Sequence, residues 1–137
     1  MVPIRGRRVL LMAESREAAR GCARSLARCG ALLIGPATTP TEALSLIANE
    51  APDAAVIDLD VAGRRAGDIA DALDRAGAAF VFVTDEGVAA GADLEDAPLL
   101  AKPPSAAALE AALDAALAAG PWRGAARPGL GTAAARC

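Results

Sequence analysis

Short apolar runs alternate along this chain with longer alanine-rich segments, and this alternation limits the possible folds more than any other feature. The apolar runs span Arg8–Met12, Ala31–Gly35, Ala54–Asp58, Ala79–Thr84 and Leu99–Ala101. The segments that separate and follow them have helical spacing and span Ser15–Cys29, Thr41–Glu50, Gly67–Ala76 and Ser105–Ala119. Continuous apolar strands that alternate with helices indicate a parallel sheet with helices on both faces.

The ends of two helices carry capping signals. Thr38 or Thr41 is the expected cap of the second helix, with Pro40 near its first turn. Ser105 is the expected cap of the last helix, whose leucines at every fourth position predict its core face.

The length of 137 residues fits one domain of ordinary size. We expect this domain to span residues 7–119. Residues 120–137 are rich in Gly, Pro, Ala and Arg without periodicity, which predicts a disordered or loosely attached tail. No apolar run is long enough to cross a membrane and the start has no signal-peptide pattern, so we expect a cytoplasmic protein without a membrane partner. The net charge of −3 does not favour nucleic acid as a partner.

The chain contains no histidine, which excludes serine–histidine catalysis and histidine-ligated metals. Its three cysteines have neither zinc-ligand spacing nor the pattern of a disulfide framework. The chemistry must therefore rest on carboxylates, hydroxyls and Lys102, the only lysine among 14 basic side chains. An ammonium is a compact point charge, unlike the broad fork of arginine, and it suits a small pocket that holds a carboxylate and an anion.

Polar side chains stand where four of the expected strands end. These are Glu14, Asp58, Thr84 and Lys102. Functional groups of a parallel α/β sheet gather at the carboxyl ends of its strands. A carboxylate nucleophile, a hydroxyl and an ammonium that hold phosphoryl oxygens, and a divalent cation on acidic ligands together suit attack on a phosphoryl group.

Three motifs resemble those of the receiver domain of two-component response regulators. They are Asp58 in Ala-Val-Ile-Asp-Leu-Asp, Thr84 in Phe-Val-Phe-Val-Thr, and Lys102 before a proline. The start Arg-Arg-Val-Leu-Leu-Met-Ala-Glu-Ser is similar to the family's first strand with its acidic pair. The short interval from Thr84 to Lys102, and Gly35-Pro36 at the end of the second strand, resemble a stand-alone subgroup common in alphaproteobacteria.

The resemblance implies a flavodoxin-like (βα)5 three-layer sandwich with strand order 2-1-3-4-5 and a fourth helix that is short or replaced by a loop. It implies a signalling protein rather than an enzyme, with at most self-phosphorylation and autodephosphorylation at Asp58. By position Asp58 is the phosphoacceptor, Thr84 the switch hydroxyl and Lys102 the phosphate-contacting lysine. The expected partners are a histidine kinase or phosphotransfer protein and a downstream protein.

Several positions depart from the family pattern. Ala13 replaces the first acid of the pair, and Glu14 is one methylene longer than the usual aspartate. Mg²⁺ demands near-ideal octahedral geometry, so we expect a weak or lost Mg²⁺ site built from Glu14, Asp58 and Asp60, the last of which partly replaces the missing ligand. Asp85 stands where a small residue is usual, and Leu99 where an aromatic switch residue is usual.

Two further interpretations of the same residues stay open. The departures also suit a pseudo-receiver, a docking or homodimerisation module that no longer needs phosphate. Asp58 and Asp60, followed by Thr84 and Lys102, also resemble the first three motifs of haloacid-dehalogenase-type phosphatases, in which the first aspartate is the nucleophile and the second the general acid. Two β-α units precede Asp58, which counts against the phosphatase.

Four arginines recur at every fourth position of the first helix and form one basic stripe. They are Arg16, Arg20, Arg24 and Arg28. Such a stripe is either a solvated helix face or a docking face for a kinase or phosphotransfer protein.

Overall fold

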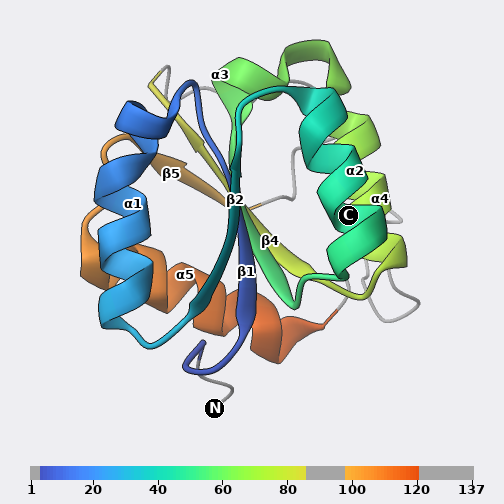
Figure 1. Ribbon diagram of the computed structural model, residues 1–137. Coiled ribbons are helices and arrows are strands. Elements are labelled where there is room, and N and C mark those ends of the chain that lie inside the picture. Colours follow the sequence, from blue (N-terminus) through green and yellow to red (C-terminus); the bar gives the residue numbers. More distant parts are fainter. Residues whose placement is uncertain (1–3, 86–97, 121–137) are drawn as a thin grey trace.

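The computed structural model describes residues 4–85 and 98–120, which form an α/β sandwich (Figure 1). Within these residues one parallel sheet has the strand order β2-β1-β3-β4-β5. Its strands are β1 (Arg8–Met12), β2 (Leu32–Ala37), β3 (Ala54–Asp58), β4 (Ala79–Thr84) and β5 (Leu99–Ala101). The flavodoxin-like fold and the strand order expected from the resemblance are confirmed.

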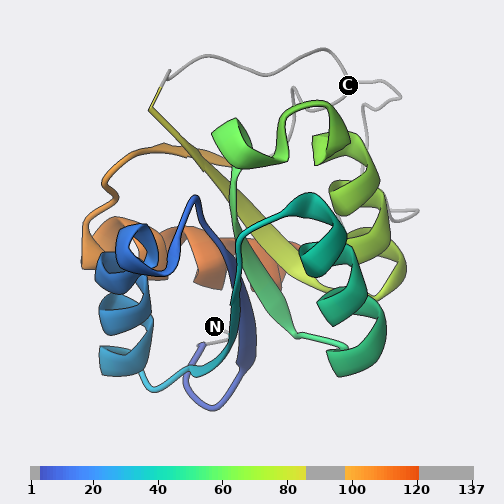
Figure 2. The same ribbon diagram turned by 45° about the horizontal axis from the view of Figure 1, so that its top comes forward.

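Helices cover both faces of the sheet. They are α1 (Arg16–Arg28), α2 (Pro40–Glu50), α3 (Leu59–Ala62), the 3₁₀ helix η1 (Gly63–Arg65), α4 (Ala66–Arg75) and α5 (Ala106–Ala119). Figure 2, in which the top of the molecule comes forward, shows α1 and α5 on one side and α2 and α4 on the other. No helix among the described residues has the length and apolarity needed to cross a membrane.

The continuous apolar strands divide their side chains between two cores. One core lies under α2 and α4 and the other under α1 and α5, and every residue of β3 and β4 is buried. Because successive side chains of a strand point to opposite faces, such a strand supplies both cores and needs no polar alternation. Phe80 and Phe82 both point to the α2–α4 side, where their rings meet edge to face with centroids 5.5 Å apart.

The second strand differs from the expected Ala31–Gly35, because it begins at Leu32 and continues through Pro36 to Ala37. The pairing with β1 shifts register between Leu10 and Met12, and Gly35 has a φ of +99° at this irregularity. A Cβ on Gly35 would lie 2.8 Å from the backbone nitrogen of Ala37. Glycine therefore permits the irregularity that carries the strand past the proline.

The expected caps of the second helix were wrong. Thr39 caps α2, because its hydroxyl accepts a hydrogen bond from the main-chain N–H of Glu42 at 3.1 Å. Pro40 takes the first helical position, which fixes the cap one residue before it. Thr38 instead donates its N–H to the Glu42 carboxylate. At the last helix, Ser105 caps α5 as expected.

Two local elements were not predicted, the short α3 and the 3₁₀ helix that joins it to α4. The helix expected between β4 and β5, short or replaced by a loop, falls within residues 86–97 and is not the helix labelled α4. Residues 121–137 hold nearly all of the expected tail. Both lie outside the described residues.

Candidate functional site

Three neighbouring strands bring the predicted phosphoryl-transfer residues to one edge of the sheet. Asp58 is the last residue of β3, Thr84 is the last residue of β4, and Lys102 directly follows β5. Asp58 and Thr84 are buried, with 4% and 1% of their surfaces exposed. The main-chain N–H of Lys102 donates to the carbonyl of Thr84 at 3.0 Å, which anchors the lysine backbone beside β4.

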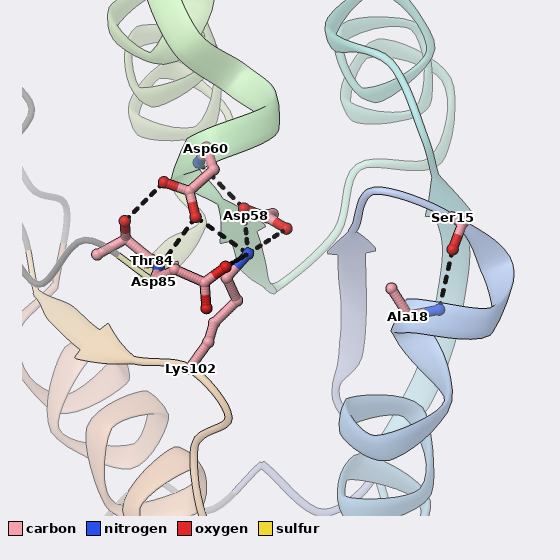
Figure 3. Close-up of polar contacts among 7 residues, drawn as sticks. All are labelled: Ser15, Ala18, Asp58, Asp60, Thr84, Asp85 and Lys102. Atoms are coloured by element: carbon pink, nitrogen blue, oxygen red, sulfur yellow. Dashed lines mark hydrogen bonds and ion pairs between the residues drawn. The ribbon is translucent and has the colours of Figure 1, made fainter.

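The Lys102 ammonium reaches back across the end of β4 to Asp58 (Figure 3). Its Nζ lies 3.1 Å from Oδ1 and 2.9 Å from Oδ2 of Asp58, and 3.0 Å from Oδ2 of Asp60. Burial alone would lower the pKa of Lys102, but the hydrogen bonds and charges of the two carboxylates outweigh it and raise the pKa above the ordinary lysine value. Lys102 is therefore a fixed positive charge at neutral pH.

Asp58 combines burial with several hydrogen bonds. Besides the two contacts with Lys102, its Oδ1 accepts the main-chain N–H of Asp60 at 3.0 Å and so caps the short helix α3. A buried carboxylate is tolerated only when it is paired and hydrogen-bonded. The strand end, the cap and the ammonium together hold this carboxylate in one orientation.

The Asp60 carboxylate makes contacts that the sequence did not reveal. Its Oδ1 accepts the hydroxyl of Thr84 at 2.7 Å, and its Oδ2 accepts the main-chain N–H of Asp85 at 2.9 Å (Figure 3). The Asp85 N–H and then the Thr84 hydroxyl lower the pKa of Asp60; burial opposes this shift and Lys102 adds to it. Asp60 is thus an ionised carboxylate, bound by groups at the ends of β4 and β5.

Of the positions that depart from the family pattern, Asp85 contacts this cluster directly. Asp85 keeps its side chain 72% exposed, with Oδ2 3.6 Å from the Lys102 ammonium. Ala13 is buried and offers only a methyl group, while its N–H pairs with the carbonyl of Ala37. Glu14 is exposed, and Ser15, which follows it, lies apart from the cluster in Figure 3.

Oxygen ligands for a metal ion are few around Asp58. In the described part of the chain no three His, Cys, Asp or Glu side chains are grouped so that they could hold a metal ion. The Lys102 ammonium already lies against both Asp58 and Asp60. Because Mg²⁺ needs about six oxygen ligands in octahedral geometry, the groups around Asp58 do not fit a tight Mg²⁺ site.

The basic stripe of α1 lies on an exposed helix face. Arg16, Arg20, Arg24 and Arg28 are all exposed, whereas Ala19 and Leu26 of the same helix are buried. The stripe is available to a partner, as the docking interpretation requires, and a solvated face would have the same exposure.

Comparisons with known proteins place the fold but not the sequence family. No protein-family model and no curated protein matches the chain. Among solved structures, the BeF₃-activated conformation of SdrG from Pseudomonas melonis Fr1 has 26% identity and a TM-score of 0.65, with 80% of this chain and 95% of that chain covered. A CheY-like receiver domain from Methylobacillus flagellatus has 23% identity and a TM-score of 0.67, with 80% and 98% covered.

A response regulator from Burkholderia pseudomallei has 23% identity and a TM-score of 0.66, with 82% of this chain and 69% of that chain covered. That structure contains a phosphorylated aspartic acid, a calcium ion and citrate. The fold of this chain is therefore that of response-regulator receiver domains.

Proposed function

We propose that this chain is a receiver domain of two-component phosphorelay signalling, in which Asp58 accepts a phosphoryl group. The observation that carries the proposal is the Lys102 ammonium, which lies 2.9 and 3.1 Å from the two oxygens of the buried Asp58 carboxylate. The chain's only lysine and its only carboxylate at the end of β3 thus meet on the edge of the sheet where such folds act.

The chemistry that suits this arrangement is in-line phosphoryl transfer. The donor is a phosphohistidine of the partner protein. An Asp58 carboxylate oxygen attacks its phosphorus, a new O–P bond forms, and the P–N bond to the imidazole breaks. The electron pair leaves with the imidazole nitrogen, which takes a proton from solvent. Lys102 and the Thr84 hydroxyl would stabilise the oxygens of the transferred group as charge develops on them.

We further propose that Mg²⁺ binds weakly, through Glu14, Asp58 and Asp60. A bound Mg²⁺ would offset the negative charge of the phosphoryl group. Titration with Mg²⁺, followed by amide shifts around Asp58, should give no saturation at millimolar concentrations. Restoring the acidic pair with Ala13→Glu and Glu14→Asp should strengthen binding, and tight saturation in the unaltered chain would contradict the proposal.

The partners follow from the same proposal. A histidine kinase or phosphotransfer protein would supply the phosphoryl group, with the exposed arginines of α1 as the docking face, and a cytoplasmic protein partner would carry the output. The phosphatase alternative is not carried forward, because β1 and β2 with their helices precede Asp58.

Phosphorylation is tested directly with a small-molecule donor. The chain is incubated with acetyl phosphate and Mg²⁺, and intact mass is measured without delay, because acyl phosphates hydrolyse. We expect a partial gain of one phosphoryl group that Asp58→Asn abolishes, while Asp53→Asn, one residue before the same strand, keeps it. No gain under any condition would refute phosphoacceptance.

That negative result would favour the second candidate, a phosphorylation-independent docking or homodimerisation module. The observation on its side is that the Asp60 carboxylate already binds both Thr84 and Lys102. A docking module should bind its partner equally well with Asp58→Asn, whereas a phosphorylation-dependent receiver should not.

A further inference from the structure

Three hydrogen-bond donors of different kinds converge on the Asp60 carboxylate. They are the hydroxyl of Thr84 at 2.7 Å, the main-chain N–H of Asp85 at 2.9 Å and the ammonium of Lys102 at 3.0 Å. A hydroxyl, a main-chain N–H and an ammonium directed at one point form a set that recognises oxyanions. Figure 3 shows these donors arranged around the two Asp60 oxygens.

The donors are held in place by contacts that do not involve Asp60. Thr84 is buried at the end of β4, where it pairs with Ala101 of β5. The Lys102 backbone is bonded to the carbonyl of Thr84, and its ammonium is also held by Asp58. Asp60 itself belongs to the short helix α3, and its side chain is 32% exposed. Removing the Asp60 carboxylate should therefore leave the donor set standing.

We propose that the Asp60 carboxylate fills, from within the chain, the cradle formed by the donors of Thr84, Asp85 and Lys102, which in the proposed function would hold the phosphoryl oxygens. Asp60 thereby acts as a built-in substitute for a tetrahedral oxyanion such as sulfate or phosphate. A free oxyanion, or a phosphoryl group on the adjacent Asp58, must displace Asp60 to reach the same donors. The inference deepens the proposed function, because it assigns to Asp60 the control of access to the Asp58 pocket.

The charge state of Asp60 supports this role. An aspartate side chain is ordinarily ionised at neutral pH. Its carboxylate accepts from all three donors as an oxyanion does.

Asp85 provides a matched control for the effect of charge alone. Its carboxylate carries the same charge and lies 3.6 Å from the Lys102 ammonium, but its side chain is 72% exposed. Asp85→Ala removes one negative charge near the cradle and keeps the main-chain N–H that belongs to it. Asp60→Ala removes the same charge and also empties the cradle.

The test is a sulfate titration of the isotopically labelled full chain, with sodium chloride added to hold ionic strength constant. The amide shifts of Thr84, residue 85 and Lys102 are followed in the wild type, Asp60→Ala and Asp85→Ala. We expect saturable binding in Asp60→Ala at least about tenfold tighter than in the other two, the equivalent of one charge-assisted hydrogen bond.

Equal sulfate affinity in Asp60→Ala and Asp85→Ala would overturn the proposal, because it would show an effect of net charge alone. Sulfate binding by the wild type as tight as that of Asp60→Ala would overturn it as well. If Asp60→Ala does not fold, Asp60→Ser gives the same comparison with a side chain suited to the start of α3. Sulfate cannot be transferred to Asp58, so the outcome does not depend on whether Asp58 is a phosphoacceptor.

Discussion

Replacing Lys102 with methionine should cost more stability than breaking any ordinary surface ion pair of this chain. Methionine keeps the apolar stem of the side chain and removes the ammonium. The partners of this ammonium differ in exposure, with 5% of the Asp58 side chain exposed, 32% of Asp60 and 72% of Asp85. Asp58 is therefore the carboxylate that water cannot rehydrate when the ammonium is lost.

The size of the effect follows from this burial. Removing one partner of a fully buried ion pair costs about 3–5 kcal/mol. Lys102 keeps 21% of its side chain exposed and the other two acids are partly hydrated, so we expect a lower cost of about 2–3 kcal/mol. In urea, where m is about 1–3 kcal/mol/M, the unfolding midpoint should fall by roughly 1 M.

The assay is urea unfolding at pH 7 followed by far-ultraviolet circular dichroism. The raised pKa of Lys102 means that its stabilising effect is complete below the ordinary lysine pKa and is lost only as pH rises through the raised value. The control is Glu50→Gln, which breaks the half-exposed pair with Arg8 at 2.8 Å and should cost less than about 1 kcal/mol.

A double-mutant cycle separates the buried charge from general damage. In an Asp58→Asn background the same Lys102→Met change should cost less than about 1 kcal/mol, because only the more exposed acids remain as partners. The reasoning fails if Lys102→Met costs no more than Glu50→Gln, or if its cost is unchanged in the Asp58→Asn background.

The other predictions concern backbone strain, acid stability and the basic helix face. Gly35→Ala should destabilise the fold by about 1–3 kcal/mol in thermal unfolding, because a Cβ would meet backbone atoms at positive φ. The control is Gly21→Ala, whose Cβ would meet nothing within 4 Å and which should be neutral or stabilising. Equal effects of the two changes would show that Gly35 is not kept by backbone strain. Because folding lowers the pKa of Asp60, its carboxylate stabilises the fold above about pH 4, the pKa of an unfolded aspartate. This stabilisation is lost as pH falls through the lower pKa of the folded state. Asp60→Asn should therefore flatten the acid limb of a stability–pH curve. An unchanged acid limb would count against that contribution. The double change Arg20→Glu and Arg24→Glu should alter stability by less than about 1 kcal/mol. It should slow association with a phosphotransfer protein and weaken the salt dependence of the association rate. Unchanged association kinetics would show that the arginine face of α1 does not dock this partner.

The sheet could be predicted because its central strands bury both faces and therefore read as uninterrupted apolar runs. β3 and β4 appear where expected, and each ends in a polar residue that belongs to the site, Asp58 and Thr84. β2 was misjudged because proline usually ends a strand, and only the pairing with β1 reveals the irregularity that accommodates Pro36.

The candidate site was predictable in its membership and less so in its contacts. The order of strand ends brings Asp58, Thr84 and Lys102 together without any knowledge of side-chain orientation. Asp60 was identified as a possible oxygen ligand, but a sequence does not say which way a carboxylate in a turn will point. Its hydrogen bond to the Asp85 N–H depends on a main-chain group, which no residue type in the sequence could signal.

The three-residue strand β5 is attached to the sheet at two levels. It pairs with β4 along Leu99–Ala101, which is short for a strand, and its following residue is tied through a side chain to β3, one strand further in. The ammonium of Lys102 thus fastens the edge of the sheet to its centre. Any event that draws this ammonium away from Asp58 should weaken the attachment of β5 before it affects β1 or β3. Amide exchange would then accelerate first at Leu100 and Lys102. A change of charge around Asp58 would therefore loosen the edge strand of the sheet.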